Sequence, residues 1–561
     1  MGTNKIILLV FFALIFVSTK MFAQAEYVPY NHPVYDYLER MNELHVIAGF
    51  NDFERPLSRR IIAKYLETVI ENISNLDKTD RLMLADFSKE FEYELTGSVK
   101  NSTSLFGDST YSFLSQNQKY IYLLADSAKA TLFVNLLADF ETIFENNRTA
   151  GNNEKASFLR WGGILRGTFL NKFGYYIKGT NGKLWGNKTV ARTVNELKFN
   201  YKLNANPAFV TATDYFDNSE GYLTADFDLV RFKIGRDQKI VGYGPVKTIL
   251  SDNTPQFDYL SLDMNYKIFS FSYFHGKLLG AATSQFDTLQ GEIKKVDEKY
   301  MGYHRLGFNF SRHLSIGMGE MIIYAGRSLD LTYLNPFNFY KSAEHSNQDR
   351  DNSLLFLDIS NNSLKGLKVS GSVLIDDIDF GKLGSGWYGN QLAYTLYARS
   401  SNLYNYYPVD LGFQYTRVEP YVYSHRITDN NYTNFGTGLT DPLKPNSDLF
   451  LFDINYRPHY RVNVSFEFRF SRHGANELNT DGTLKRNVGG DVQYGHRNSD
   501  PEKVTFLDGD MEYYRSITFS SVFEPIKNYF ISGRVEYQHN SLQNSNIQKF
   551  LTAYLLINLS L

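Results

Sequence analysis

The chain has 561 residues, with 58 Lys and Arg against 60 Asp and Glu, so its formal net charge is −2. This balance excludes electrostatic capture of nucleic acid as the main function, because that function needs a strongly basic surface. The absence of cysteine excludes disulfide bonds and thiolate chemistry, and a mean hydropathy of −0.34 excludes a bundle of membrane-spanning helices.

The amino terminus has the pattern of a secretory signal. Lys5 precedes an apolar run from Ile6 to Val17, and Ala23-Gln24-Ala25 supplies the small residues that a signal peptidase requires. We predict that residues 1–25 form a cleaved signal peptide and that Glu26 starts the mature chain. An uncleaved anchor helix is the alternative, and export of a cysteine-free chain is typical of a Gram-negative envelope.

Residues 26–95 are expected to form a small periplasmic helical domain. Three amphipathic stretches place apolar residues three and four positions apart. The first follows Pro33 and ends before Gly49, and the second begins after Ser58, a good N-cap. The third carries Leu84, Phe87, Phe91 and Leu95 on one side. Three such helices can share one core.

From residue 96 to residue 561 the hydrophobic period changes to two. Val464, Phe466 and Phe468 alternate with Ser465, Glu467 and Arg469, and Leu555 and Ile557 show the same pattern near the carboxyl terminus. A soluble sandwich also alternates, but this pattern recurs over more than 450 residues and sets full charges opposite apolar faces. We therefore predict a mainly β fold, an outer-membrane antiparallel barrel at residues 96–561.

The strand number follows from the length of this region. At roughly 25 to 30 residues per strand, it gives about 16 to 18 strands, and the 16% of Tyr, Phe and Trp can furnish two interfacial girdles. Polar stretches rich in Asn, Asp and Gly predict loops at 145–155, 429–447 and 473–503. Loops that face outward would meet a partner.

The sequence offers no motif for catalysis or metal binding, so we predict no catalytic, cofactor or metal residues. It has no HExxH, GxSxG, Walker or dinucleotide-binding pattern. His304 and His313 would lie on opposite strand faces because their separation is odd. Asp376, Asp377 and Asp379 form the densest acidic cluster, and a solvated strand end explains them better than a calcium site.

Two polar aromatic stretches are candidate sugar-binding loops. Rings stack on the faces of pyranoses, and planar polar side chains bind their hydroxyl groups. An interfacial girdle or a plain loop would have the same composition. The candidate residues are Tyr404, Tyr406, Tyr407, Asn430, Asn431 and Tyr432.

Five ordered segments resemble the Wzi-type capsule assembly family. They are GRDQKIVGYGPVKTILSDN from Gly235, HRLGFNFSRHLSIGMGEMIIYAGRSLDLTYLNPFNFY from His304, NSLLFLDIS from Asn352, VLIDDI from Val373 and WYGNQLAY from Trp387. Two positions depart from that family's pattern, since Tyr243 replaces a usual Trp and Val246 replaces a Gly. The chain also ends in Leu561, where an aromatic residue is common in barrels.

The resemblance implies an outer-membrane barrel of 18 strands with a periplasmic helical bundle, acting without catalysis as a lectin for capsular polysaccharide. Its implied partners are capsular or other surface polysaccharide, outer-membrane lipid and other components of capsule export. We expect most of the matching residues to serve polar packing of the lumen, where Arg305 and Glu320 would need charge partners. These residues are Arg236, Gly242, Gly244, Pro245, Ser251, Asn253, His304, Arg305, Glu320, Asn335, Pro336, Glu344, Asn352, Asp376 and Asp377.

Other functions stay open at this point. A channel or porin for small solutes is the alternative, favoured by a continuous wet lumen, whereas a lumen filled by side chains favours polysaccharide binding. An outer-membrane hydrolase would need Ser, His and carboxylate groups at one end of the barrel. Residues 32–66 also resemble one S-layer homology module, which would suit a tether to the cell wall.

Overall fold

The computed structural model describes residues 24–107, 111–126, 130–200, 203, 213–289, 291–402, 408–543 and 546–561. The predicted signal segment therefore lies outside the described residues, apart from Gln24 and Ala25. No helix in the described part of the chain is long and apolar enough to cross a membrane.

Within the described residues, 18 antiparallel strands close into a barrel, in which each strand pairs with the next and the last pairs with the first. A short strand, β4 (Tyr122–Asp126), lies beside the start of β5, next to the end of β27. The predicted mainly β barrel is confirmed. Its strands are β5 (Ala130–Asn147), β6 (Asn152–Phe169), β7 (Phe173–Gly186), β8 (Tyr215–Asp226), β9 (Val230–Asp237), β11 (Phe257–Tyr266), β12 (Phe269–Asp287), β13 (Gly291–Asn309), β14 (Leu314–Ala325), β15 (Asn352–Asn361), β16 (Leu367–Asp377), β17 (Gln391–Ser400), β18 (Val409–Val418), β21 (Ser447–His459), β22 (Val462–Ala475), β25 (Asp510–Ile526), β26 (Tyr529–Leu542) and β27 (Asn546–Ser560).

The period of two places apolar side chains outside the barrel and charged ones inside. Phe468, Leu555 and Ile557 are exposed on the outer wall. Glu467 and Arg469 alternate with Phe468 on β22, and both line a cavity inside the barrel. Neighbouring strands repeat the pattern, and the result is an apolar outer belt around a polar lumen.

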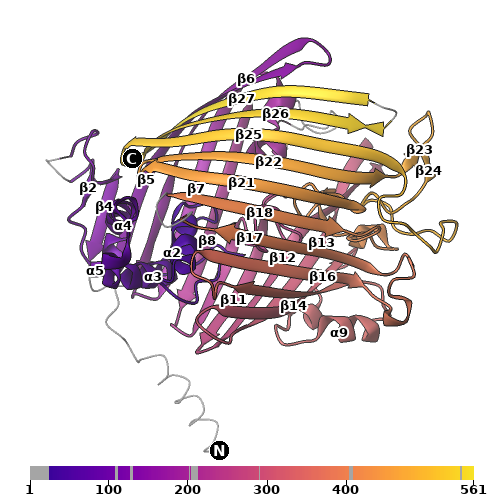
Figure 1. Ribbon diagram of the computed structural model, residues 1–561, viewed down its shortest axis with the longest axis horizontal. Coiled ribbons are helices and arrows are strands. Elements are labelled where there is room, and N and C mark those ends of the chain that lie inside the picture. The colour runs from indigo at the N-terminus through magenta and orange to yellow at the C-terminus, as the bar shows by residue number, and fades with distance from the viewer. Residues whose placement is uncertain are drawn as a thin grey trace, which may run out of the picture.

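The two ends of the barrel differ in their connections (Figure 1). The end that carries the helices and the carboxyl terminus has short turns, such as 170–172, 267–268 and 460–461, and we call it the helix end. At the opposite end, which we call the loop end, the strands are joined by long segments. The main ones are 187–214, 238–256, 326–351, 378–390, 419–446 and 476–509.

Two of the predicted loops contain more strand than expected. Strands β5 and β6 pair through Asn147 and Asn152, so 145–155 is a tight hairpin and not a loop. Strand β22 continues to Ala475 before the chain leaves the barrel. Hydrogen bonding to a neighbouring strand holds these polar residues in extended structure, which composition does not reveal.

The helices before the barrel form where the apolar period predicts them. They are α2 (Val34–Glu43), α3 (Arg59–Glu71), α4 (Lys78–Glu90) and α5 (Glu92–Thr96), and they share one core with Val34, Leu38, Ile62 and Leu84. Ser58 caps α3, because its hydroxyl accepts a hydrogen bond from the backbone of Ile61. The third predicted helix divides at Phe91 into α4 and α5.

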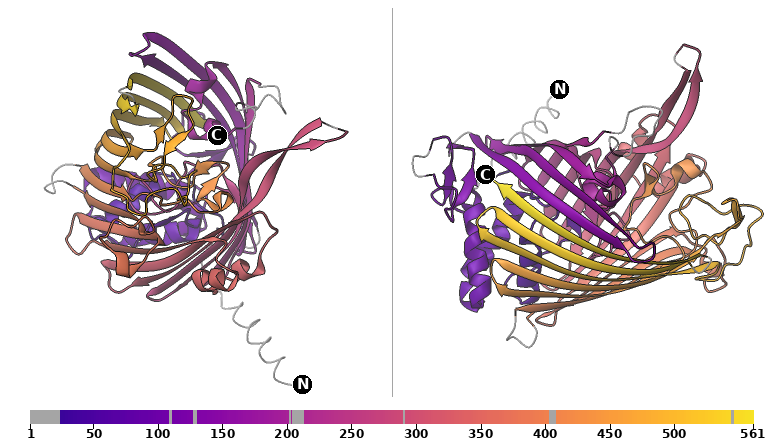
Figure 2. Two further views of the ribbon diagram at one scale, coloured as in Figure 1. Left: turned by 90° about the vertical axis from the view of Figure 1, so that its right-hand side faces the viewer. Right: turned by 90° about the horizontal axis from the view of Figure 1, so that it is seen from above.

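Strands β12 and β13 extend beyond the loop end as a hairpin arm, which Figure 2 shows projecting from the wall. The view from the loop end in Figure 2 also places the indigo helices within the ring of strands, at its far end. The helices therefore close the barrel at the helix end.

Candidate functional site

The amino-terminal segment enters the lumen as an extended strap, residues 24–31. Thr168 donates its hydroxyl to Glu26 at 2.8 Å, and Arg166 donates to the same carboxylate at 2.8 Å. Further along, the backbone N–H of Tyr27 donates to the hydroxyl of Tyr222 at 3.0 Å. These partners lie on β6 and β8, so the strap is fixed to the inner face of the wall.

A layer of ion pairs, in which the barrel side chains are buried, attaches α2 to the barrel. Arg399 of β17 contacts Glu39 at 2.8 Å and Asp36 at 2.7 Å, and Lys368 of β16 contacts Glu39 at 2.8 Å. Arg457 of β21 also pairs with Asp36. Arg399, Lys368 and Arg457 are all less than 5% exposed, so these charges have little access to water. Buried charges need such partners, and each side of the contact therefore depends on the other.

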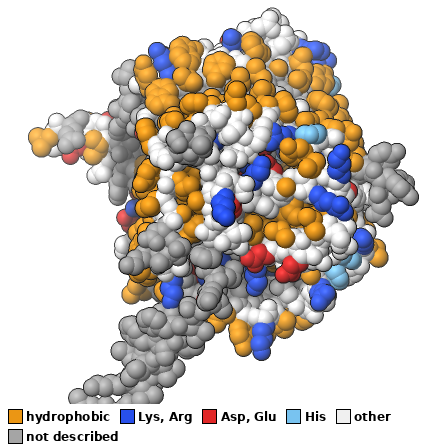
Figure 3. All heavy atoms as spheres, turned by 90° about the vertical axis from the view of Figure 1, so that its left-hand side faces the viewer, with side chains coloured by type: hydrophobic (Ala, Val, Ile, Leu, Met, Phe, Trp, Pro, Cys, Tyr) orange, Lys and Arg blue, Asp and Glu red, His pale blue; other side chains and the backbone are white. Residues whose placement is uncertain are grey.

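Figure 3 shows the helix end as a space-filling surface on which apolar and polar side chains are mixed. On this face Lys and Arg lie scattered among apolar side chains, and Asp and Glu are less frequent in view. We call residues 24–96, which comprise the strap, the helices α2 to α5 and their connections, the plug.

One buried carboxyl group in the plug, that of Glu43, should make the stability of the protein depend on pH. Burial raises the pKa of Glu43 to about 8, and its Oε1 accepts no hydrogen bond from the described residues. The folded protein then keeps a proton that the unfolded chain releases above a pKa of about 4.3. The contribution of this carboxyl group to the stability of the fold is fully present below that pH and is lost as the pH rises through 8. We expect Glu43→Gln to remove this loss, so that its melting temperature exceeds that of the wild type more at pH 8 than at pH 5.

Glu71→Gln is the matched control, because Glu71 is exposed at the end of α3. Thermal melting of both variants and the wild type at pH 5, 6, 7 and 8 provides the comparison. An equal offset of Glu43→Gln at every pH would contradict a buried neutral carboxyl group.

Segments from the loop end fold down into the lumen and meet the plug. Glu54–Arg55 of the plug forms a short strand, β1, which pairs with β10 (Ile240–Val241) of segment 238–256. The ring of Phe53 lies 4.8 Å from that of Tyr243 and 6.0 Å from that of Phe356 on the barrel wall. The middle of the lumen is therefore packed with side chains.

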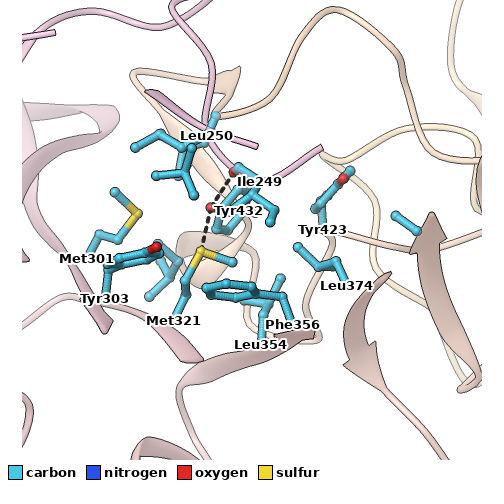
Figure 4. Packing of buried hydrophobic residues seen from close by; sticks show 14 of the residues in the cluster. Ile249, Leu250, Met301, Tyr303, Met321, Leu354, Phe356, Leu374, Tyr423 and Tyr432 are labelled. Carbon is cyan, nitrogen blue, oxygen red and sulfur yellow. Dashed lines mark hydrogen bonds between the residues drawn. The ribbon is translucent and has the colours of Figure 1, made fainter. Parts of the chain in front are cut away.

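Figure 4 shows the cluster that results. Tyr432, from segment 419–446, donates its hydroxyl to the backbone oxygen of Ile249 at 2.7 Å and lies 3.0 Å from the sulfur of Met321. Leu354 and Phe356 of β15 pack from the wall. Two loop-end segments, the wall and the plug thus share one hydrophobic core inside the barrel.

A charged group crosses this core. Arg305 of β13 donates two hydrogen bonds to Asp358 of β15, at 2.7 and 2.8 Å, and its guanidinium lies over the ring of Phe53. Tyr243, which replaces the Trp of the resembling family, donates its hydroxyl to Asp358 at 3.2 Å. Gly317 on the intervening strand β14 lets the pair form, because a Cβ there would collide with both side chains.

The packed core leaves a cavity of about 1010 Å³ on one side of the lumen, which we call the lumen cavity. The strap forms its floor with Tyr27 and Tyr30, and β5 to β9 form its wall. Residues of segments 187–214 and 238–256, at the loop end, also line it. The cavity combines rings, amides and charges, a lining that suits a polar ligand with apolar faces.

Ion pairs hold much of the charge in this lining. Arg160 contacts Glu196 at 2.6 Å and Glu141 at 3.3 Å, and Lys178 contacts Glu220 at 3.0 Å. A second cavity of about 540 Å³ lies across the lumen, between residues 441–444 and the inner face of β22, β25 and β26. The central core separates the two.

Most of the motif residues connect the inward-folded segments to one another and to the wall. Asn352 donates to the backbone of Asn430 at 3.1 Å, and Asp376 accepts from the backbone N–H of Tyr423 at 2.6 Å. Ser251 and Asn253 bind the backbone of Leu439 and Thr440. Gly242 and Gly244 have φ values of 130° and 71°, which turn segment 238–256 beside Pro245. Asp377 and Arg236 are exposed, and Arg236 pairs with Asp258 on the outer face.

His304 and Glu320 were expected in the lumen, and the structure places them on the outer wall. Arg305 faces inward, so its neighbour His304 must face outward, and Glu320 lies directly opposite His304. The two side chains are 3.2 Å apart, and Glu320 accepts the backbone N–H of Tyr340 at 2.7 Å. Arg305 and Glu320 therefore use different partners.

Segment 326–351 covers these two residues from outside. It contains α8 (Leu331–Leu334) and α9 (Tyr340–Ser346), and Tyr333 and Tyr340 pack on Ile322 of the wall. Asn335 is exposed, Pro336 follows it between the two helices, and Glu344 accepts from Lys341 and Ser353. Glu320 and Glu344 hold the segment on the wall.

The candidate sugar-binding loops divide between two situations. Tyr404, Tyr406 and Tyr407 lie outside the described residues. Asn430, Asn431 and Tyr432 are less than 5% exposed and bind backbone groups, so their side chains face the protein interior. The lumen cavity, which sequence reasoning missed, draws on strands and segments that are remote in the chain.

In the part of the chain that the structure describes, no group of three or more His, Asp or Glu is placed to hold a metal ion. Asp376 and Asp377 point to different partners, and Asp379 caps a short 3₁₀ turn. The three carboxylates of the acidic cluster therefore make contacts within the protein.

No protein-family model matches the chain, and no curated protein matches it in sequence. Among solved structures it is similar to Wzi of Escherichia coli, described as an outer membrane protein involved in group 1 capsule assembly and a carbohydrate-binding β-barrel. The match has a TM-score of 0.56 at 10% identity and covers 95% of this chain and 99% of that one. The chain shares the fold of Wzi. OprD of Pseudomonas aeruginosa matches with a TM-score of 0.41 at 8% identity, over 76% of this chain and 95% of that one.

Proposed function

We propose that this protein is an outer-membrane barrel that binds capsular or another surface polysaccharide and helps to attach it to the cell, without turnover. The observation that carries the proposal is the lumen, which the plug and the inward-folded segments fill while leaving a polar, ring-lined cavity toward the loop end. A filled lumen suits binding better than passage of solutes. The Wzi fold supports the same function.

The orientation follows from the two ends. Outer-membrane barrels have short periplasmic turns and longer extracellular loops. The helix end then faces the periplasm, and the loop end, with the lumen cavity below it, faces the medium where the polymer lies. The apolar belt that includes Phe468 and Leu555 would contact lipid.

The lining suits a saccharide in two respects. Tyr30 and Phe199 offer rings for the faces of pyranoses, and Asn195 and Asp252 offer hydrogen bonds to hydroxyl groups. Both features support a binding protein.

We expect Tyr30→Ala and Asp252→Ala each to weaken binding of an oligosaccharide by about tenfold. The oligosaccharide is prepared from the surface polymer of the cells that produce this protein. The expected weakening corresponds to the ~1 to 1.5 kcal/mol that one stacked ring or hydrogen bond contributes. The Tyr30 hydroxyl donates to Asp252 at 3.1 Å, so the double variant should lose less than the sum. Calorimetry on the purified barrel measures the affinity.

Tyr494→Ala is the control, since Tyr494 is exposed on segment 476–509, away from the cavity. Cells that lack the protein should still make the polymer but release it into the medium. Full retention of polymer by those cells, together with ion conductance of the wild-type barrel, would favour the channel function instead.

A further inference from the structure

Segment 326–351 leaves β14 at the loop end and folds back over the outside of the barrel wall. Arg327 donates two hydrogen bonds to Asp351, each at 2.7 Å, which joins the beginning of the segment to its end. Between them, the hydroxyl of Tyr273 on β12 donates to the backbone oxygen of Leu334 at 2.8 Å. These contacts fix the segment on the wall, and Figure 1 shows its helix α9 beside β14 toward the loop end.

The side chains of the segment divide between two faces. Tyr333 and Tyr340 are buried against the wall. Leu331, Phe337 and Phe339, which we call the collar residues, are 76%, 70% and 66% exposed. The segment therefore buries two rings on the wall and presents large apolar side chains on its outside.

The collar residues continue the apolar belt of the barrel. The ring of Phe337 stacks on that of Phe271 on β12, with 5.2 Å between the ring centroids. On the outer face Phe271 pairs with Leu306, and Leu306 pairs with Met318, which is exposed. The segment therefore reaches down the wall to the level of the belt.

Polar wall residues lie beneath the segment. The pair His304 and Glu320 is the next outward pair after Leu306 and Met318 toward the loop end. The ring of Tyr340 stacks on that of His304 at 4.5 Å, and the backbone N–H of Tyr340 donates to Glu320. The segment thus covers a polar part of the wall and places apolar side chains outside it.

Polar groups of the segment are satisfied inside the protein. Asn335 accepts the backbone N–H of Phe337 at 3.1 Å, and Asn338 donates to the backbone oxygen of Thr332 at 3.0 Å. Pro336 has no N–H to satisfy. The backbone N–H groups that donate within the protein are those of Thr332, Tyr333, Leu334, Phe337, Asn338 and Tyr340. Contact with lipid requires such bonds, because acyl chains offer no partner to an irregular backbone.

Lipid fits the collar residues better than a protein partner does. A specific protein interface needs about 20–30 residues on each side. The collar has three large apolar residues, and they adjoin a belt that faces lipid in the proposed orientation. Phenylalanine and leucine side chains on a segment that lies along a membrane surface insert at the boundary between headgroups and acyl chains.

We propose that segment 326–351 lies in the outer leaflet and inserts Leu331, Phe337 and Phe339 among the acyl chains. This inference rests on the outer-membrane placement proposed above and is independent of saccharide binding. The barrel then contacts the outer leaflet through its strands and, at β12 to β15, through this folded-back segment. The segment shields His304 and Glu320 from lipid.

Single spin labels test the placement, because the chain has no cysteine of its own. Leu331→Cys, Phe337→Cys and Phe339→Cys are labelled one at a time in the complete barrel, which is reconstituted into phospholipid vesicles. Collisions of the label with oxygen report lipid, and collisions with a nickel chelate report water. We expect the ratio of the two collision rates at each collar position to lie within about twofold of that at Met318→Cys in the belt.

Phe380→Cys is the matched control. Phe380 is 76% exposed on segment 378–390, between the exposed Asp379 and Lys382, so its label should meet water. We expect its ratio of oxygen to nickel collisions to be roughly fivefold lower than that of the collar positions.

Charged substitutions give an independent result. Phe337→Asp with Phe339→Asp should lift the collar out of the lipid, because carboxylates are costly there. The label at Leu331→Cys should then show a roughly fivefold lower ratio. Phe337→Leu with Phe339→Leu keeps the apolar surface and should leave the ratio at that label within about twofold.

Collar labels that meet the nickel chelate as readily as the label at Phe380→Cys would overturn the inference, as would an unchanged ratio after the charged substitutions. Labels that neither reagent reaches would also overturn it, because a protein partner would then cover the collar. Dipolar broadening that disappears on dilution with unlabelled protein would identify that partner as a second copy.

Two further outcomes separate this inference from the proposed function. Failure of the barrel to bind oligosaccharide would overturn the proposed function and leave the inference standing. Water around the label at Met318→Cys would overturn the outer-membrane placement, and the inference with it.

Discussion

Reversing the charge of Arg399 and Arg457 together should release the plug and make the barrel conduct ions. Both side chains are buried on the wall and pair with Asp36 of α2, and Arg399 also holds Glu39. Glutamates in their place would set like charges together in a space with little water. Breaking one buried pair costs about 3–5 kcal/mol, so the plug should lose most of its attachment. The lumen cavity would then open to the helix end.

Conductance in planar bilayers and protease cleavage of the amino-terminal helices measure this release. The wild type should conduct little and resist cleavage. The double variant Arg399→Glu with Arg457→Glu should conduct ions and be cleaved. Arg236→Glu is the control, because Arg236 forms an exposed pair with Asp258 on the outer face. A folded double variant that stays closed and protected would show that the central core alone retains the plug.

Asp358→Ala should destabilise the barrel strongly, by about 3–5 kcal/mol, because it leaves the buried guanidinium of Arg305 without its bidentate partner. Glu54 is 3.6 Å from Arg305 and compensates part of the charge. The loss should appear as a lower melting temperature and as earlier unfolding when folded and unfolded forms are separated by electrophoresis.

Asp258→Ala makes a matched comparison. Asp258 also forms a bidentate pair with an arginine, but both partners are about half exposed, and such pairs contribute about 0–1 kcal/mol. Gly317→Ala should resemble Asp358→Ala, since its methyl group would collide with the Arg305–Asp358 pair. Similar stability of Asp358→Ala and Asp258→Ala would contradict a buried charge in the core.

The barrel could be predicted from the sequence because strand geometry is local. Phe468 and Glu467 must face opposite sides of a strand whatever the rest of the fold does, and the apolar face of α2 is equally visible in the spacing of Val34 and Leu38. The position of the plug could not be predicted. Asp36 and Glu39 have the pattern of a solvated helix face, and their partners Lys368 and Arg399 lie more than 300 residues away.

The candidate site was harder to predict for the same reason. Segments rich in Asn and Tyr were expected outside the barrel, yet Asn430 and Tyr432 fold inward, where backbone groups of distant segments satisfy them. Composition does not distinguish a loop that meets solvent from one that fills a lumen. The alternation of side chains along a strand was the available signal for which residues face the lumen. Adjacent residues such as His304 and Arg305 cannot lie on the same face of a strand.

The seam between β27 and β5 determines the order in which the molecule can be assembled. Strand β5 pairs with β27 from Phe550 to Ser560, so the wall cannot close until the last strand has been made. The plug, by contrast, precedes β5 in the chain and is available first. A plug that has docked on the wall before this step is enclosed when the seam closes. A chain that stops before β27 would leave β5 and β26 as open edges, which bind other chains readily.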